Sequence, residues 1–252
     1  MTEHLPKVVS DEEKFEFHRD GVVCLRGVFD DKWIELLKTG LQKNLNAPGA
    51  RSRIYDRTDD DHFFLYDSDN WQQITEYEEF VYQSPCAQIA AELLKAESVH
   101  FFFEAVFFRS RGVTFPTPWH QDEPYWSVEG MDTVSIWKPL VPVEQQSALA
   151  FVPGSHRKGI RPHRQSNVMG FSQGITDFGE ADREAEAQMH AAPGDLIVHH
   201  CLTIHRADAN PSERFRRALG LVYYARRARA DTERAQAYQK ELMEKWRKDG
   251  KL

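Results

Sequence analysis

Residues 99–226 constrain the fold more than any other part of this chain. Val99 to Phe108 is an almost unbroken apolar run, which is typical of a strand buried on both faces. Further short strand patterns follow, and Pro-Gly pairs at 153–154 and 193–194 separate them. The region before it, 10–98, has mostly helical patterns, with one short strand predicted at 21–26 and a loop at 47–62. These patterns predict a mainly β fold with flanking helices.

The order of the predicted elements favours a jelly roll, in which two antiparallel sheets form a half-open barrel. The mouth of such a barrel can hold a small ligand. We expect one domain over residues 1–252, with a helical part at about 10–98, a β core at about 99–226 and a charged helix at about 231–248. The long polar segment at 157–192 is typical of a lid.

The net charge and the apolar content of the chain argue against some classes of function. The 252 residues include 32 Lys+Arg and 39 Asp+Glu, a net charge of -7. This charge disfavours non-specific binding to nucleic acid and offers no large positive field for a membrane surface. No apolar stretch approaches the roughly 18 residues of a membrane-spanning helix, and the amino terminus does not resemble a signal peptide.

The cysteines indicate the compartment. Cys24, Cys86 and Cys201 are widely spread and form no CxxC pair. This spacing argues against a disulfide scaffold and a structural zinc site, and it favours a reducing compartment. We therefore expect a cytoplasmic protein that acts on a small molecule, without a nucleic-acid or membrane partner. Its oligomeric state stays open.

His120 and Asp122 are the first part of a predicted metal site. On a strand, a spacing of two places both side chains on one face, roughly 6.5 Å apart along the backbone. An imidazole and a carboxylate can then bind one cation. A second histidine from a distant strand would complete the two-histidine, one-carboxylate set of non-haem Fe(II) oxygenases, which leaves coordination positions open. A solvated surface pair is the alternative for these two residues alone.

Several histidines are candidates for the second histidine ligand. His199 and His200 are adjacent, so on a strand they point to opposite faces. His205 lies just before the turn predicted at Asn210-Pro211. The candidates are His156, His163, His190, His199, His200 and His205.

Several stretches of the chain together resemble the phytanoyl-CoA dioxygenase family of Fe(II)/2-oxoglutarate oxygenases. The resemblance covers about 13–226 and depends on order, spacing and flanking residues. It implies a double-stranded β-helix, which is a jelly-roll, cupin-like barrel. The stretches are 17–23, 119–126, 128–130, 135–137, 148–156 and 193–196, followed by His205 and, eleven residues later, Arg216.

The resemblance also implies the roles of individual residues. His120, Asp122 and His205 would bind the iron, and Arg216 would bind the distal carboxylate of 2-oxoglutarate. A semi-buried carboxylate suits a planar, permanently charged, two-pronged donor, which arginine provides and lysine does not. A surface position is the alternative for Arg216.

Other positions are expected near the same cofactor. Trp137 would form an aromatic wall, with core packing as its alternative. Arg109 would help to hold 2-oxoglutarate or would end a strand at the surface, and Gln121 is a further candidate for cofactor binding. Ala218 and Gly220 share the strand parity of Arg216, and we expect them to leave space for the cofactor.

Substrate-binding residues are predicted from position. Tyr125 and Trp126 follow the metal motif and are expected to line the pocket. Arg161 and His163 begin the expected lid, where they would meet an anionic substrate. A solvated basic turn is the alternative for the second pair.

The resemblance implies an Fe(II)- and 2-oxoglutarate-dependent dioxygenase. It would use O2 to hydroxylate an unactivated C–H bond of a small molecule, with release of succinate and CO2. The presence of Asp122 favours a hydroxylase over related halogenases, and no catalytic residue beyond the metal ligands is expected. Two alternatives stay open: a jelly-roll metal enzyme that does not use 2-oxoglutarate, and a non-catalytic metal-binding or sensing barrel. The substrate, including any link to CoA, is not predicted.

Overall fold

The computed structural model describes residues 8–55, 62–112, 116–126, 128–129, 132–164 and 174–231, with the single positions 233, 240 and 244. The helix predicted at 231–248 lies almost entirely outside the described residues. The expected lid at 157–192 is described except for residues 165–173. No helix within the described ranges is long and apolar enough to cross a membrane.

Helices and strands alternate before residue 99. The first helix begins with a capping box: Glu13 N donates to Ser10 Oγ at 3.2 Å, and Ser10 N donates to the Glu13 carboxylate at 2.7 Å. The elements are α1 (Asp11–Asp20), β1 (Val22–Leu25), α2 (Asp31–Asn46), β2 (Arg53–Tyr55), β3 (Phe64–Ser68), α3 (Thr75–Gln83) and α4 (Cys86–Leu93).

Strands β2 and β3 depart from the mostly helical prediction for this part. The expected loop at 47–62 contains β2, and β3 follows it directly. Phe64 of β3 pairs with Arg109 of the long strand that follows, and Leu65 pairs with Phe108. The partner of β3 is thus more than 40 residues away, and β2 pairs in turn with β3. Local patterns do not contain such a distant partner.

The β core has the strands predicted for it. The elements are β4 (Val99–Arg109), η1 (Glu123–Tyr125), β5 (Val128–Glu129), β6 (Thr133–Pro139), η2 (Gln145–Ser147), β7 (Leu149–Phe151), η3 (Ser155–Lys158), β8 (His163–Arg164), β9 (Gly174–Ile175), α5 (Glu180–Glu184), β10 (Ala187–Met189), β11 (Leu196–His200), β12 (His205–Ala207), β13 (Arg216–Ala225) and β14 (Arg229–Ala230).

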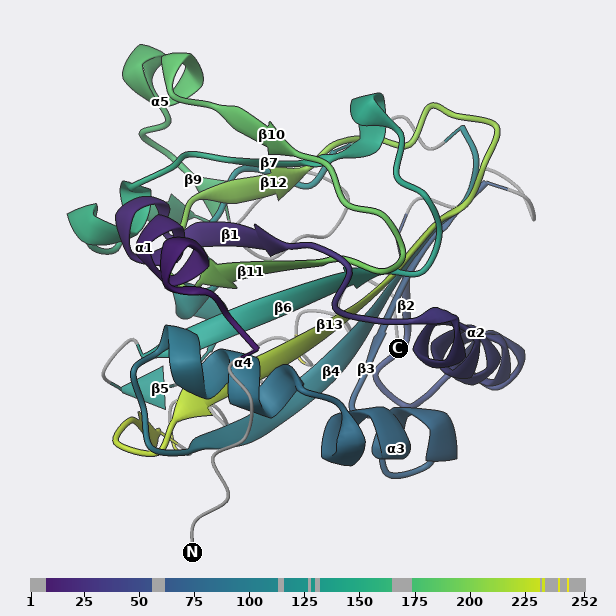
Figure 1. The fold of residues 1–252 in the computed structure, drawn as a ribbon. Coiled ribbons are helices and arrows are strands. Elements are labelled where there is room, and N and C mark those ends of the chain that lie inside the picture. Colours follow the sequence, from purple (N-terminus) through teal and green to yellow (C-terminus); the bar gives the residue numbers. More distant parts are fainter. Residues whose placement is uncertain are drawn as a thin grey trace, which may run out of the picture.

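Two antiparallel sheets position the site. The large sheet has seven strands in the order β1-β11-β6-β13-β4-β3-β2, and the small sheet has the order β10-β7-β12. In Figure 1 the small sheet lies above β1 and β11, while α2, α3 and α4 lie along the lower part of the large sheet. The prediction of a mainly β fold with antiparallel sheets and flanking helices is confirmed.

The two faces of the large sheet bury different clusters. On one face Val23, Val198 and Ile136 pack into the main core with residues of all four amino-terminal helices. On the other face Ile197 and Trp137, with Val22 and Ala218, pack against Leu149 and Phe151 of the small sheet. Side chains alternate between faces along a strand, so the second set, together with polar neighbours on the same strands, borders the space between the sheets.

Candidate metal centre

His120, Asp122 and His205 come together at the small sheet. Their ligand atoms all lie within 4.8 Å of one another. His120 and His205 form an antiparallel bridge, in which each backbone N donates to the other residue's carbonyl oxygen at 3.0 Å. Asp122 Oδ1 lies 3.6 Å from His120 Nε2 and 3.7 Å from His205 Nε2. The residues predicted as ligands therefore form one compact group.

The local backbone differs from the strand expected around His120 and Asp122. Asp122 has φ -76° and ψ -30°, and the η1 turn follows it. The backbone N atoms of Asp122 and Glu123 both donate to Cys201 O, at 2.9 and 3.1 Å. The chain therefore turns after the bridge at His120, and this turn, instead of strand parity, brings the carboxylate to the two imidazoles.

Backbone carbonyls fix both imidazole rings. His120 Nδ1 lies 2.8 Å from Pro118 O, and His205 Nδ1 lies 2.9 Å from Thr203 O. A carbonyl only accepts, so each Nδ1 carries a proton, and Nε2 is the ring nitrogen on the side of Asp122 that can bind a metal. Burial, followed by the charges of His120 and His199, lowers the pKa of His205 well below its usual value. A neutral imidazole is the form that binds metals.

The carboxylate of Asp122 is held in its ionised form. Burial alone would raise its pKa, but His205, His120 and His199 outweigh burial and hold the pKa well below the usual range. Two imidazoles and one carboxylate are thus brought together by the fold. This donor set suits Fe(II) with open coordination positions, and it would also accept Zn²⁺.

Arg216 and Arg109 lie opposite each other on β13 and β4. Both are buried, with 5% and 1% of their surface exposed. Arg216 Nη1 donates to the carbonyls of Ser147 at 2.5 Å and Asp208 at 2.9 Å, and Arg109 Nη1 donates to Asp208 O at 3.4 Å. The surface positions given as their alternatives are therefore excluded.

Burial destabilises the charged form of both guanidinium groups. Burial lowers the pKa of Arg216 to about 10, although the nearby Asp208 opposes this shift. Burial, and then the charge of Arg216, lowers the pKa of Arg109 well below its usual value. Buried charges are stable when an opposite charge pairs with them. A carboxylate bound beside them would further stabilise these buried positive charges.

The remaining cofactor predictions have mixed outcomes. Trp137 is 7% exposed and belongs to the cluster between the sheets, together with Ala218. A Cβ at Gly220 would lie 3.0 Å from the ring of Phe107. The expectation that Gly220 leaves space for the cofactor is therefore wrong, because an aromatic side chain occupies that space.

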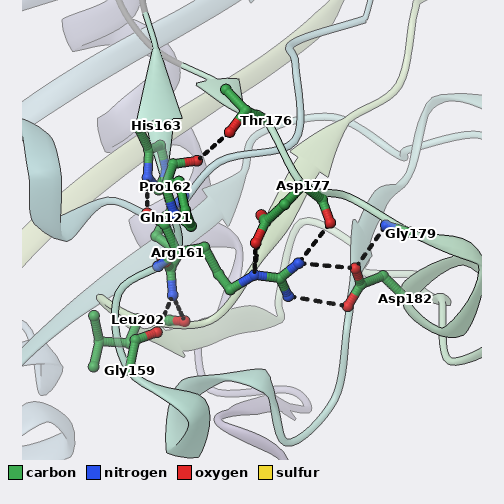
Figure 2. A network of polar contacts seen from close by, with 10 residues as sticks. All are labelled: Gln121, Gly159, Arg161, Pro162, His163, Thr176, Asp177, Gly179, Asp182 and Leu202. Carbon is green, nitrogen blue, oxygen red and sulfur yellow. Dashed lines mark hydrogen bonds and ion pairs between the residues drawn. The ribbon is translucent and has the colours of Figure 1, made fainter.

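The side-chain amide of Gln121 joins backbone groups of two other segments (Figure 2). Its Nε2 donates to Gly159 O at 2.9 Å and Leu202 O at 2.7 Å, and its Oε1 accepts from Arg161 N at 2.8 Å. Both amide protons are thus committed to backbone carbonyls. The side chain supports the turn between two ligands instead of facing a cofactor.

His163 and Arg161 are likewise committed to the protein. Gln121 N donates to His163 Nε2 at 3.1 Å, and His163 Nδ1 lies 2.7 Å from Arg161 O. Figure 2 shows the Arg161 guanidinium between two carboxylates. Its Nε lies 2.9 Å from Asp177 and its Nη1 lies 3.3 Å from Asp182. These contacts contradict both the anionic-substrate role and the solvated turn, since the guanidinium charge is already paired.

The structure describes the side chain of only one of the two aromatic residues after the metal motif. Trp126 is partly buried, and its ring lies 6.1 Å from that of Phe103 in an edge-on arrangement. The side chain of Tyr125 lies outside the described residues. Their role in lining a substrate pocket stays a prediction.

One residue near the centre has no role in the predicted site. His199 Nε2 lies 3.1 Å from Asp122 Oδ2. Strand parity could have predicted this position, because His199 shares a strand face with Ile197, which packs between the sheets. The ion pairs of Arg161 with Asp177 and Asp182 are also not predicted, because no local sequence pattern indicates them.

Comparison with known proteins agrees with this geometry. The family model of phytanoyl-CoA dioxygenase (PhyH) matches residues 17–218. A 1-deoxypentalenic acid 11-beta-hydroxylase of Streptomyces arenae is 25% identical over 229 residues, which cover 81% of this chain and 77% of that protein. A probable phytanoyl-CoA dioxygenase of Caenorhabditis elegans is 29% identical over 112 residues, covering 42% of this chain but only 35% of that protein.

A solved structure supports the fold. The non-heme alpha ketoglutarate dependent carbocyclase SnoK from nogalamycin biosynthesis is 24% identical, with a TM-score of 0.74 over 88% of this chain and 86% of that chain. The residues matched by the family model, 17–218, span most of the chain and include the three-residue metal group and Arg216. The chain therefore belongs to the phytanoyl-CoA dioxygenase family.

Proposed function

We propose that this protein is an Fe(II)- and 2-oxoglutarate-dependent oxygenase that hydroxylates a C–H bond of a small molecule. The observation that carries the proposal is the compact group of His120, Asp122 and His205, which has the donor set of a non-haem iron centre. A double-stranded β-helix formed by the two sheets, as one cytoplasmic domain over 1–252, is part of the same proposal.

The ligand group would bind the metal without rearranging. Carbonyls hold the Nδ1 atoms of both imidazoles, so Nε2 is the nitrogen of each ring that would bind the metal. The neighbouring imidazoles hold the pKa of Asp122 well below its usual range, and the ionised carboxylate is the form that binds a metal. When bound, Fe(II) with 2-oxoglutarate and O2 supplies the oxidising chemistry, and succinate and CO2 are released.

Arg216 and Arg109 would bind the distal carboxylate of 2-oxoglutarate. Arg216 offers a planar fork, and the second guanidinium adds charge in a buried environment where it is weakly screened. Trp137 would shield the cofactor from water on the large-sheet side. These side chains thus orient the co-substrate and exclude solvent around it.

The substrate is proposed only as a class. The Streptomyces arenae relative carries the name 1-deoxypentalenic acid 11-beta-hydroxylase, and a small molecule suits a mouth between two sheets. Arg161 does not contribute to substrate charge in this proposal, because Asp177 and Asp182 already pair with it. Trp126 and Tyr125 remain the residues proposed to contact the substrate.

The proposal is tested by anaerobic visible absorption. The metal-free protein is titrated with Fe(II) and then with 2-oxoglutarate, and Asp122→Ala is titrated in parallel. We expect a charge-transfer band that needs both additions and that the variant lacks. Fe(II) binding without this band would favour the metal enzyme that does not use 2-oxoglutarate or the binding protein, whereas absence of Fe(II) binding would reject the metal centre.

A further inference from the structure

His199 is a third imidazole at the metal centre. It belongs to β11 of the large sheet, whereas His205 belongs to β12 of the small sheet. The two ring centroids lie 4.3 Å apart, and His199 is only 3% exposed. Its Nε2 lies 3.1 Å from Asp122 Oδ2, so it reaches the carboxylate from the opposite sheet.

The two oxygens of Asp122 face different partners. Oδ1 is the oxygen near His120 and His205, at 3.6 and 3.7 Å from their Nε2 atoms. Oδ2 faces His199, which lies outside the three-residue group that shares the 4.8 Å limit. Since an ionised carboxylate only accepts hydrogen bonds, His199 Nε2 is the donor of this contact.

The other end of the His199 ring indicates why an imidazole stands here. Nδ1 is buried and has no hydrogen-bond partner in the part of the chain that the structure describes. Val22 pairs with His199 across the strands, and the ring of Phe151 lies 5.5 Å from its ring. An apolar side chain at this position would avoid the cost of a buried polar atom without a hydrogen bond. The donor at Nε2 is therefore the feature that distinguishes histidine at this position.

We propose that His199 is a positioning residue that keeps Asp122 a monodentate metal ligand. Its Nε2–H binds Oδ2 and leaves Oδ1 for the metal. The group of His120, Asp122 and His205 leaves three coordination positions open, and a bidentate co-substrate and O2 together need all three. A bidentate carboxylate would occupy one of these positions. This inference depends on the metal centre of the proposed function, and it adds a residue that controls how many positions stay open.

The experiment measures binding of Co(II) alone by the full chain, from its visible d–d absorption. His199→Gln retains an N–H donor near the position of Nε2, whereas His199→Asn is too short to reach Oδ2 and His199→Phe has no donor. Ile197→Val is the matched control on the same strand face. Circular dichroism and thermal unfolding verify the fold of each variant, and the Gln–Asn pair decides the question where His199→Phe does not fold.

We expect His199→Asn and His199→Phe to weaken Co(II) binding by about 10- to 100-fold, the usual effect of losing a partner of a metal ligand. Their absorption bands should also change, because the carboxylate becomes free to bind through both oxygens. His199→Gln and Ile197→Val should keep the affinity and spectrum of the wild type.

Two results would overturn the inference about His199 alone. One is unchanged Co(II) binding in all three variants, and the other is an equal loss in all three, which would indicate packing instead of a hydrogen bond. Failure of the wild type to bind Co(II) would overturn the metal centre and this inference together. Co(II) binding that depends on His199, without the 2-oxoglutarate band, would leave this inference intact and reject only the proposed co-substrate.

Discussion

The carboxylate of Asp122 contacts three imidazoles, and the two kinds of contact differ in consequence. His120 and His205 both approach Oδ1 and have their other nitrogen bound to a carbonyl, so they are ready to bind a metal. His199 contacts Oδ2 instead. The carboxylate oxygen that each histidine approaches thus distinguishes the two expected metal ligands from His199, which orients the carboxylate.

Arg216→Lys tests the co-substrate site at the level of one side chain. Lysine keeps the charge but loses the two parallel N–H donors. We expect the 2-oxoglutarate concentration for half-maximal decarboxylation to rise about tenfold or more, which corresponds to about 1.4 kcal/mol, with Fe(II) affinity unchanged. Arg214→Lys, at an exposed position on the same segment, is the control. An unchanged half-saturation in Arg216→Lys would remove this arginine from the site.

At the scale of secondary-structure elements, α5 and the segment before it are held in two ways. Arg161 joins Asp177 to Asp182, the latter within α5. The rings of Trp119 and Phe178 stack at 4.5 Å with an angle of 14°, and Ile175 N donates to Trp119 O at 2.9 Å. The described part of the expected lid is therefore fastened to the residue directly before the first ligand.

Asp182→Asn tests this fastening. The amide can still accept from Gly179 N, a contact of 2.9 Å in the wild type, but it no longer pairs with the guanidinium charge. We expect the local opening free energy of 174–184 to fall by about 1 kcal/mol, between the values of exposed and buried ion pairs. Hydrogen exchange followed by mass spectrometry measures it, with the exposed Glu180→Gln as the control. Equal exchange in both variants would contradict the role of the pair.

For the whole molecule, a buried carboxyl group couples stability to pH. Glu104 is fully buried on β4, and its carboxylate accepts from Asn70 N at 2.6 Å. Burial raises its pKa from 4.5 to about 7. Between these two values the folded chain keeps a proton that the unfolded chain releases, so protonation stabilises the fold at low pH and this contribution is lost as pH rises through about 7.

Glu104→Gln should remove that dependence. A shift of this size corresponds to at most about 3 kcal/mol of unfolding free energy. We expect the variant to gain stability relative to the wild type on going from pH 5 to pH 8, as measured by urea unfolding at both values. A difference between the two proteins that is the same at pH 5 and pH 8 would show that Glu104 does not titrate in this range.

The sequence predicts those features that depend on local motifs and on the local pattern of apolar residues. Motif order and spacing are enough to assign His120, Asp122 and His205, and the strands of the β core follow from apolar alternation. Strand parity is the wrong explanation for the approach of Asp122 to the histidines, because the turn depends on Cys201 O, far along the chain. Long-range partners of this kind leave no periodic signal.

The same limit explains the other misassigned residues. Arg161 is predicted to meet a substrate, but its partners lie 16 and 21 residues further on, in a segment without regular alternation. Gly220 is predicted to leave room for the cofactor, yet the ring of Phe107 from the neighbouring strand fills that space. In both cases the missing information is which side chain of another element comes near.

The bridge between His120 and His205 has a consequence beyond ligation. β12 is an end strand of the small sheet, and the segment before Asp122 covers it: Thr117 N donates to Ala207 O at 2.9 Å, and His120 exchanges two hydrogen bonds with His205. Uncovered sheet edges recruit strands from other molecules and start aggregation. The segment that carries the first ligands thus also covers the edge of the small sheet. A bound metal that stiffens this segment would therefore protect the protein against self-association, in addition to its role in catalysis.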